Sequence, residues 1–317
     1  MQMHDFVAIG DIVTDTFIRL KDASVHCDID REKCTITMPF GEKIPFDSAE
    51  DVYAVGNSPN AAVSAARLGL SSALIADLGD DALGKECLAA LESNKVDVGL
   101  VKTHAGHTTN HHYVLWYEDD RTILVKHEAY EYKLPEFAPP KWLYLSSLGE
   151  DTLDYHRQIV EYLNRHPETS LAFQPGTFQI NMGRELKEVY ARTAIFFCNI
   201  AEAEKILGIN TLGKEELLKR MRELGPKIVV LTDGPSGAYA YDGREVISQK
   251  PFPDTKPPLE RTGAGDAFAS TTVAALALGH DLLTALSWGA VNSMSVVQQV
   301  GAQKGLLTRE GIERLLK

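Results

Sequence analysis

The chain has 317 residues, of which 44% are apolar, enough for a sizeable core in one large α/β domain or two smaller ones. A net charge of −12, a pI near 5.3 and the lack of any basic run argue against nucleic acid or an anionic membrane as partner and favour small-molecule chemistry. No apolar run reaches the length of a membrane span and residues 1–5 lack the features of a signal peptide, so we expect a cytoplasmic protein.

The four cysteines are Cys27, Cys34, Cys87 and Cys198, and they contain no C-x-x-C pair. This pattern predicts reduced thiols. Cys27 and Cys34 could be neighbours on adjacent strands, but we do not predict a disulfide between them.

The first predicted element is a buried strand, because Phe6–Gly10 is a short apolar run that ends in glycine. Asp11 and Asp15 follow at its carboxyl end, where ligands bind in open α/β sheets. Turn formation is the alternative for both carboxylates, and it is the stronger interpretation for Asp11. Residues 16–54 alternate short β-prone pieces with Asp, Pro and Gly, which predicts an inserted antiparallel element.

Residues 56–69 predict an alanine-rich helix that packs closely on the sheet. At its start the amides of Asn57 and Asn60 would face a ligand, unless they only solvate the end of the helix. Further on, residues 108–117 and 121–125 predict a β-hairpin. The nearby histidines are better placed for a substrate contact by one of them than for metal binding, because none of them has an i,i+4 partner on a predicted helix and no cysteine is nearby. They are His104, His107, His111 and His112.

From Trp142 onward, apolar strands alternate with amphipathic helices, which predicts a mainly parallel sheet with helices on both faces. Two polar groups directly follow strands of this sheet. Asn199 and Glu202, three residues apart, could hold magnesium through its waters or form a helix capping box. The stretch Thr232–Gly237 could receive the phosphate or ribose of a nucleotide, or simply turn a hairpin.

The most informative stretch is Thr262–Asp266, a glycine-rich turn that opens the apolar helix 267–278. The unpaired N–H groups and the dipole at a helix start bind an anion such as phosphate. A carboxylate beside that anion is useful if it takes a proton from the nucleophile that attacks phosphorus. Asp266 therefore indicates phosphoryl transfer, although an Asp in a first helical turn is also common.

The order of these motifs along nearly the whole chain resembles the ribokinase-like, or PfkB, carbohydrate kinase family. The motifs are an Asp after the first strand, Gly-x-x-x-Asn before an Ala-rich helix, Asn-x-x-Glu, Thr-x-Gly and Thr-Gly-Ala-Gly-Asp. The competing G-x-x-x-x-G-K-[ST] motif is absent, and the dinucleotide fingerprint lacks its third glycine. The resemblance implies an α/β fold with one ribokinase-like domain over residues 1–317, a central mainly parallel sheet and a small β-sheet lid from inserts at about 16–54 and 107–126.

The resemblance also implies the role of each site residue. Asp266 would be the general base, with Gly263, Ala264 and Gly265 as an anion hole; Asn199 and Glu202 would order the Mg²⁺ shell. Thr232, Gly234, Gly237 and Asn292 would line ATP together with Asn199, Gly263 and Gly265, and Asp15, Gly56, Asn57 and Asn60 would bind the acceptor.

Three departures from the family pattern are present. Val55-Gly56 replaces Gly-Gly, and Gln174-Pro175-Gly176-Thr177 replaces the commoner Asp-Pro-Asn, with a Pro-Gly similar to that of nucleoside kinases. Glu260-Arg261 replaces Asp-Thr, an acidic position tied to monovalent-cation activation, so activation by such a cation is left open.

We therefore expect an ATP-dependent kinase that phosphorylates a hydroxymethyl group of a sugar, as ribokinase and fructokinase do. A nucleoside kinase for adenosine, inosine or cytidine is the alternative, and a non-catalytic sugar sensor is a third reading. The lid strands carry the apolar residues Phe17, Ile36, Val114 and Trp116 and have free edges, so pairing of two lids would give a homodimer.

Overall fold

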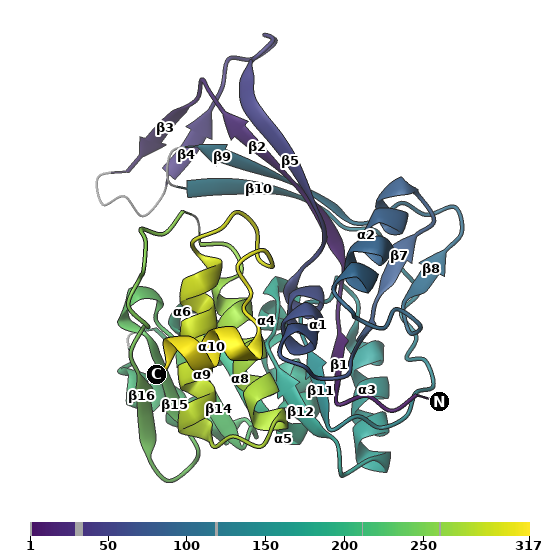
Figure 1. Ribbon diagram of the computed structural model, residues 1–317, viewed down its shortest axis with the longest axis vertical. Coiled ribbons are helices and arrows are strands. Elements are labelled where there is room, and N and C mark those ends of the chain that lie inside the picture. Colours follow the sequence, from purple (N-terminus) through teal and green to yellow (C-terminus); the bar gives the residue numbers. More distant parts are fainter. Residues whose placement is uncertain (1, 29–33, 118–119, 211, 260) are drawn as a thin grey trace.

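The computed structural model describes residues 2–28, 34–117, 120–210, 212–259 and 261–317, centred on an eight-stranded sheet (Figure 1). Its strands lie in the order β16 (Val246–Gln249), β15 (Ala238–Tyr241), β14 (Ile228–Thr232), β13 (Thr193–Asn199), β12 (Ser170–Phe173), β11 (Trp142–Leu145), β1 (Phe6–Ile9) and β6 (Ser72–Ile75). All neighbours from β14 to β6 are parallel, whereas β15 and β16 pair antiparallel at one edge.

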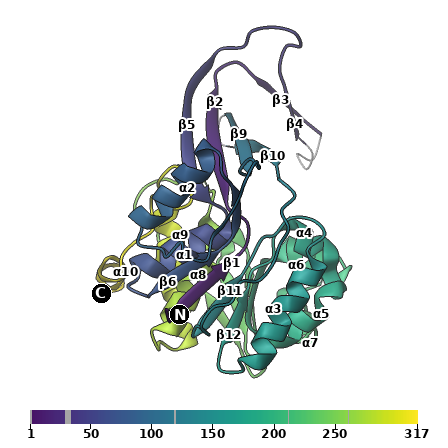
Figure 2. The ribbon, with the colours of Figure 1, turned by 90° about the vertical axis from the view of Figure 1, so that its right-hand side faces the viewer.

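Helices cover both faces of this sheet, as Figure 2 shows from the side. The strand β1 is buried on both faces, because Phe6 and Ala8 join one core cluster while Val7 and Ile9 join the other. Such two-sided burial explains the unbroken apolar runs of the parallel strands. One layer holds α1 (Asn57–Arg67), α2 (Ala82–Ser93), α8 (Ala264–Ala277), α9 (Leu282–Val296) and α10 (Arg309–Leu315), and the other holds α3 (Leu153–Arg165), α4 (Thr177–Met182), α5 (Lys187–Arg192), α6 (Ile200–Leu207) and α7 (Lys214–Glu223).

A smaller sheet stands over the carboxyl end of β1 (Figure 1). Its strands lie in the order β10 (Asp120–Lys126), β9 (His111–Tyr117), β2 (Val13–Leu20) and β5 (Phe46–Val55). The pairs β2–β5 and β9–β10 are antiparallel, and a parallel β2–β9 pairing joins the two inserts into one sheet. We call this four-stranded sheet the lid. With the helix-flanked main sheet, it confirms the predicted fold class.

Two short strand pairs complete the fold. They are β7 (Asp77–Gly79) with β8 (Lys102–His104), and β3 (Ser24–Cys27) with β4 (Cys34–Thr37). Among the described residues, no helix is both long enough and apolar enough to cross a membrane.

A disulfide joins Cys27 and Cys34, so the prediction of reduced thiols is wrong for this pair. The antiparallel register of β3 and β4 places the two residues directly opposite each other. The residue spacing alone does not determine that register. Cys87 and Cys198 are buried free thiols, as predicted.

The buried histidine of α3 makes folding stability depend on pH. His156 is 1% exposed, its Nδ1 lies 2.7 Å from the Thr152 carbonyl oxygen, and burial lowers its pKa below the usual 6.5. As the pH falls below 6.5, the unfolded chain binds a proton that the folded chain excludes, so stability decreases until the pH reaches the lower folded pKa. We expect His156→Gln to flatten this part of the stability profile. Urea unfolding of both proteins from about pH 7.5 to 5 measures it, and parallel profiles would contradict the assignment.

Candidate active site

The turn before α8 has the backbone of an anion-binding site. Gly263 is the N-cap of α8 in the left-handed region, at φ 77°, and makes no side-chain cap. A Cβ at Gly263 would lie 2.3 Å from the Cβ of Ala302, so only glycine fits there, whereas a Cβ at Gly265 would meet open space. The Ala264 N–H donates to the Arg261 carbonyl oxygen at 3.4 Å, and the N–H groups that follow it in the first turn of this 14-residue helix are available to a negatively charged group.

Asp266 lies in the first turn of α8 and accepts hydrogen bonds from three side-chain amides. Asn57 and Gln174 donate to Oδ1, each at 3.0 Å, and Asn60 donates to Oδ2 at 2.8 Å. Burial raises the pKa of Asp266, and the hydrogen bonds from Asn60 and Gln174 oppose that rise. The structure thus brings Asn57 and Asn60, predicted to bind the acceptor, into contact with the predicted base.

Two further residues orient these amides. The Tyr144 hydroxyl donates to Gln174 Oε1, which leaves the Gln174 Nε2 group to face Asp266. Gln303 Nε2 donates to Asn60 Oδ1 at 2.9 Å, which fixes the direction of the Asn60 amide in the same way. Gln174 directly follows β12, so its place at the carboxyl edge could have been predicted. Nothing in the sequence pattern points to Gln303.

Asp11 and Asp15 lie at the base of the lid, and each faces a histidine. Asp15 Oδ1 is 3.3 Å from His112 Nδ1, and Asp11 Oδ2 is 3.5 Å from His127 Nδ1. The Tyr132 hydroxyl donates to Asp11 Oδ1 at 2.8 Å. His112 is one of the predicted histidines, but the sequence reasoning missed His127 and Tyr132, which follow the hairpin without a motif.

The other predicted histidines have different partners. His104 Nε2 lies 2.6 Å from Asp77 Oδ1. His111 precedes His112 in β9 and therefore points to the opposite face of the lid from His112, where its Nε2 lies 2.8 Å from Thr16 Oγ1. Within the described part of the chain, no group of three or more His, Cys, Asp or Glu side chains is arranged to hold a metal ion.

A cavity of about 310 Å³ lies beside the turn of α8 and is lined by Thr232, Gly234, Gly237, Ala264 and Gly265, all predicted to bind ATP or its phosphates. At Gly237 the φ angle is 94°, and a Cβ would lie 2.2 Å from the Gln249 carbonyl oxygen, so glycine is required for the chain to pass. An apolar wall suits a nucleotide base. That wall includes Pro251, Phe252, Pro258, Phe268, Met294 and Val297, and Lys250 and Arg261 add positive charge.

Asn292 does not line this cavity, which corrects its predicted place beside adenine. Its side chain is fully buried; Nδ2 donates to Thr271 Oγ1 at 2.7 Å, and Oδ1 accepts from the Leu307 N–H at 2.8 Å. The residues of α9 that line the cavity lie on one face of the helix, where positions repeat every three to four residues, and Asn292 lies on a different face. The lining face is formed by Ala290, Ser293, Met294 and Val297.

Asn199 and Glu202 form a reciprocal capping box at the start of α6. The Asn199 side chain accepts from the Glu202 N–H and the Glu202 side chain accepts from the Asn199 N–H, each at 2.8 Å. Burial raises the pKa of Glu202, and the charge of Asp266 raises it further. The capping role is therefore present, and the repulsion between the two carboxylates suits a nearby cation.

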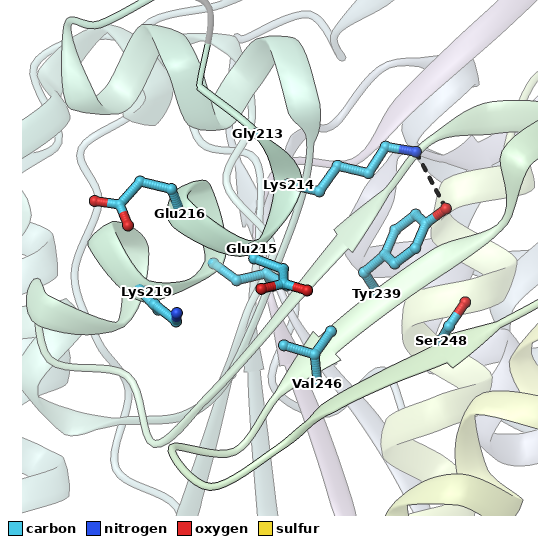
Figure 3. A pocket seen from close by; sticks show the side chains of 9 residues that line it. Gly213, Lys214, Glu215, Glu216, Lys219, Tyr239, Val246 and Ser248 are labelled. Carbon is cyan, nitrogen blue, oxygen red and sulfur yellow. Dashed lines mark hydrogen bonds between the residues drawn. The ribbon is translucent and has the colours of Figure 1, made fainter.

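A larger cavity of about 710 Å³ lies between α7 and the edge strands β15 and β16 (Figure 3). None of the predicted site residues lines it. Lys214 connects it to the loop after β14: its Nζ donates to the Tyr239 hydroxyl at 3.1 Å, as drawn in Figure 3, and lies 2.6 Å from Asp233. The hydrogen bond from Lys214 lowers the pKa of Asp233. This ion pair supports the loop that places Thr232 and Gly234 in the wall of the 310 Å³ cavity.

The fold and this site together define a ribokinase-like protein. The chain superposes on ribokinase from Arabidopsis thaliana complexed with ribose and ATP, with a TM-score of 0.83 and 20% identity, covering 100% of this chain and 99% of that one. It superposes similarly on a nucleoside kinase from Methanocaldococcus jannaschii, with a TM-score of 0.81, 18% identity and 98% of both chains covered. These likenesses show the fold.

Residues 25–309 match the pfkB family carbohydrate kinases, and the chain belongs to that family. Relatives of similar length include ribokinase from Bacillus subtilis, 28% identical over 274 residues that cover 82% of this chain and 87% of that one. A cytidine kinase from Thermococcus kodakarensis is 27% identical over 313 residues, covering 94% and 98%. The protein is an ATP-dependent phosphotransferase with an alcohol group as acceptor, a carbohydrate or nucleoside kinase.

Proposed function

We propose that this kinase transfers the γ-phosphoryl group of ATP to a hydroxymethyl group of a sugar, with Asp266 as general base. The observation that carries the proposal is the position of Asp266 in the first turn of α8, held by three amide donors beside an open helix N-terminus. Amide donors favour the ionised carboxylate, which is the form that accepts a proton.

In the proposed step, the acceptor oxygen forms a bond to the γ-phosphorus as the bond to the β-phosphate oxygen breaks and ADP leaves. The acceptor proton moves to the Asp266 carboxylate. The N–H groups of Gly263, Ala264, Gly265 and Asp266 donate to the developing negative charge on the phosphoryl oxygens. Partial burial raises the pKa of Asp266, which makes it a stronger base than an exposed Asp.

Magnesium would neutralise part of the phosphate charge when bound with ATP. Asn199 and Glu202 would hold its water shell. These residues fit that role, because a bound cation would relieve the repulsion between the carboxylates of Glu202 and Asp266. Activation by a monovalent cation is tested by a potassium titration in the same assay.

The magnesium role predicts the effect of Glu202→Gln. The amide oxygen still accepts from the Asn199 N–H, so the cap is kept while the negative charge is lost. We expect the magnesium concentration for half-maximal rate to rise about tenfold, with thermal stability unchanged. An unaltered magnesium titration would leave Glu202 with the capping role alone.

The acceptor is tested by measuring kcat/KM for ribose, fructose, adenosine, inosine and cytidine side by side. We place sugars ahead of nucleosides on family grounds, as for the Bacillus subtilis ribokinase. The nucleoside alternative is favoured by Gln174-Pro175-Gly176 and by Phe178, whose ring meets His127 edge to face at 5.9 Å and could flank a base. A nucleoside preferred by more than about tenfold, or 1.4 kcal/mol, would reverse our order. If none of the five compounds stimulates ADP formation, the proposed acceptor class is wrong.

The lid also supports a proposed homodimer. Phe17 and Val114, two of the apolar lid residues on which the dimer prediction rests, are only 5% and 1% exposed, because they lie on the face toward the main body. The outer face instead carries Tyr113 and Leu124, which are directly paired and 43% and 52% exposed. A second copy would cover these side chains and the edges of β5 and β10.

We therefore expect sedimentation to give a dimer mass. Leu124→Glu should shift the protein toward monomer without unfolding it, because the side chain is half exposed. A monomer mass at every concentration would refute the dimer.

A further inference from the structure

We propose that Gln303 is a positioning residue for phosphoryl transfer, which holds the Asn60 amide with its nitrogen toward Asp266 and so keeps that carboxylate ionised. The inference rests on the proposed function, in which the ionised Asp266 takes the proton of the acceptor. Gln303 lies in the loop between α9 and α10 and acts through Asn60.

A backbone carbonyl group decides which way these amides point. Gln303 Nε2 lies 2.7 Å from the Ala54 carbonyl oxygen and 2.9 Å from Asn60 Oδ1. A carbonyl oxygen can only accept a hydrogen bond, so the Gln303 atom that faces Ala54 must be the nitrogen. The second N–H of that nitrogen requires an acceptor, so the Asn60 oxygen faces Gln303. The Asn60 nitrogen is left to donate to Asp266 Oδ2 at 2.8 Å.

Helix α1 holds both the main chain and the side chain of Gln303. Arg67 Nη1 donates to the Gln303 carbonyl oxygen at 2.7 Å and to the Leu306 carbonyl oxygen at 3.0 Å. Arg67 lies two turns after Asn60 on the same face of α1. Gln303 is 8% exposed, so reversing its amide would place two oxygens against each other in a buried position. The contacts therefore fix one orientation of the Gln303 amide.

The direction of the Asn60 amide matters because Asp266 is buried. Burial raises the pKa of Asp266, and the hydrogen bonds from Asn60 and Gln174 oppose that rise. With the Asn60 amide reversed, its Oδ1 would face Asp266 Oδ2, and two facing acceptors favour the protonated carboxyl group. A protonated Asp266 cannot take the acceptor proton.

Two other titratable side chains interact with Asp266. Tyr144 of β11 is fully buried, and burial and the charge of Asp266 raise its pKa well above the usual range, so it stays neutral. Burial raises the pKa of Glu202 of α6, and the charge of Asp266 raises it further. Both residues are kept in the variants of Gln303, so every protein compared contains them.

Gln303→Glu tests the inference, because an ionised carboxylate of similar size can only accept hydrogen bonds. We expect the Asn60 nitrogen to turn toward the new carboxylate, so that Asp266 loses a donor and its pKa rises by at least about one unit. NMR titration of protein with ¹³C-labelled aspartate, without ATP or acceptor, measures this pKa, and Asp266→Asn identifies the signal. The acid limb of kcat/KM should move upward by the same amount. Gln299→Glu, at an exposed position of the same loop, is the matched control and should move neither value.

Gln303→Met separates the loss of the donor from the added charge. It removes both N–H groups and leaves the Asn60 amide free to reverse, so we expect a smaller rise of the Asp266 pKa in the same titration. If Gln303 only ties its loop to α1, both variants lose thermal stability while the Asp266 pKa keeps its wild-type value. That result in either folded variant would overturn the proposal. A raised pKa with an unmoved acid limb would instead contradict Asp266 as the base, because the NMR arm needs no turnover.

Discussion

We expect Asp266→Asn to lower kcat by about 10²–10⁴-fold while KM for ATP stays within about twofold, because asparagine cannot accept the acceptor proton and the glycine-rich turn before α8 is kept. The raised pKa of Asp266 adds a second expectation. The acid limb of kcat/KM for the wild-type protein should lie above the usual aspartate value of 3.8, since the base is active only when ionised.

The control for this variant is stability. Asparagine offers one oxygen to the amides of Asn57, Asn60 and Gln174, so a modest loss of thermal stability is expected. Rates are therefore compared at a temperature where both proteins are folded. A folded Asp266→Asn protein with near-wild-type kcat would show that another group takes the proton.

Asn60→Asp should produce the second large effect by placing two carboxylates side by side. Asn60 is 3% exposed, and its Nδ2 lies 2.8 Å from Asp266 Oδ2, so the substitution replaces a donor by a like charge. Repulsion raises the pKa of Asp266 further. We expect kcat/KM near pH 7 to fall about 10–100-fold and the acid limb to move upward by at least about one pH unit, with partial recovery at higher pH.

Asn164→Asp is the matched control, because Asn164 is exposed on α3. It should shift neither the rate nor the acid limb. If Asn60→Asp lowers kcat/KM equally at every pH, the loss reflects acceptor binding alone, and the role of Asn60 in holding the base is wrong.

The order of strands, helices and polar loops along the chain could be predicted because it follows from local patterns of apolar and polar residues. Unbroken apolar runs such as Phe6–Ile9 reflect burial on both faces, and the carboxyl end of each parallel strand reaches the same edge of the sheet. Thr232, Gly234, Ala264 and Gly265 follow such patterns, and they line one cavity. The glycines needed at positive φ, Gly237 and Gly263, are likewise visible as residue types.

The sequence by itself therefore determined the fold class, the glycine-rich turn before α8 and the position of Asp266 next to it. Only the tertiary structure decided which side chains meet there, because contacts between residues 206 to 209 positions apart, such as Asn60 and Asn57 with Asp266, depend on helix packing. The same holds for the parallel β2–β9 pairing, for the Cys27–Cys34 disulfide and for the burial of Asn292. Register and helix rotation set these outcomes, and both are fixed by the packed neighbours of an element rather than by its own residues.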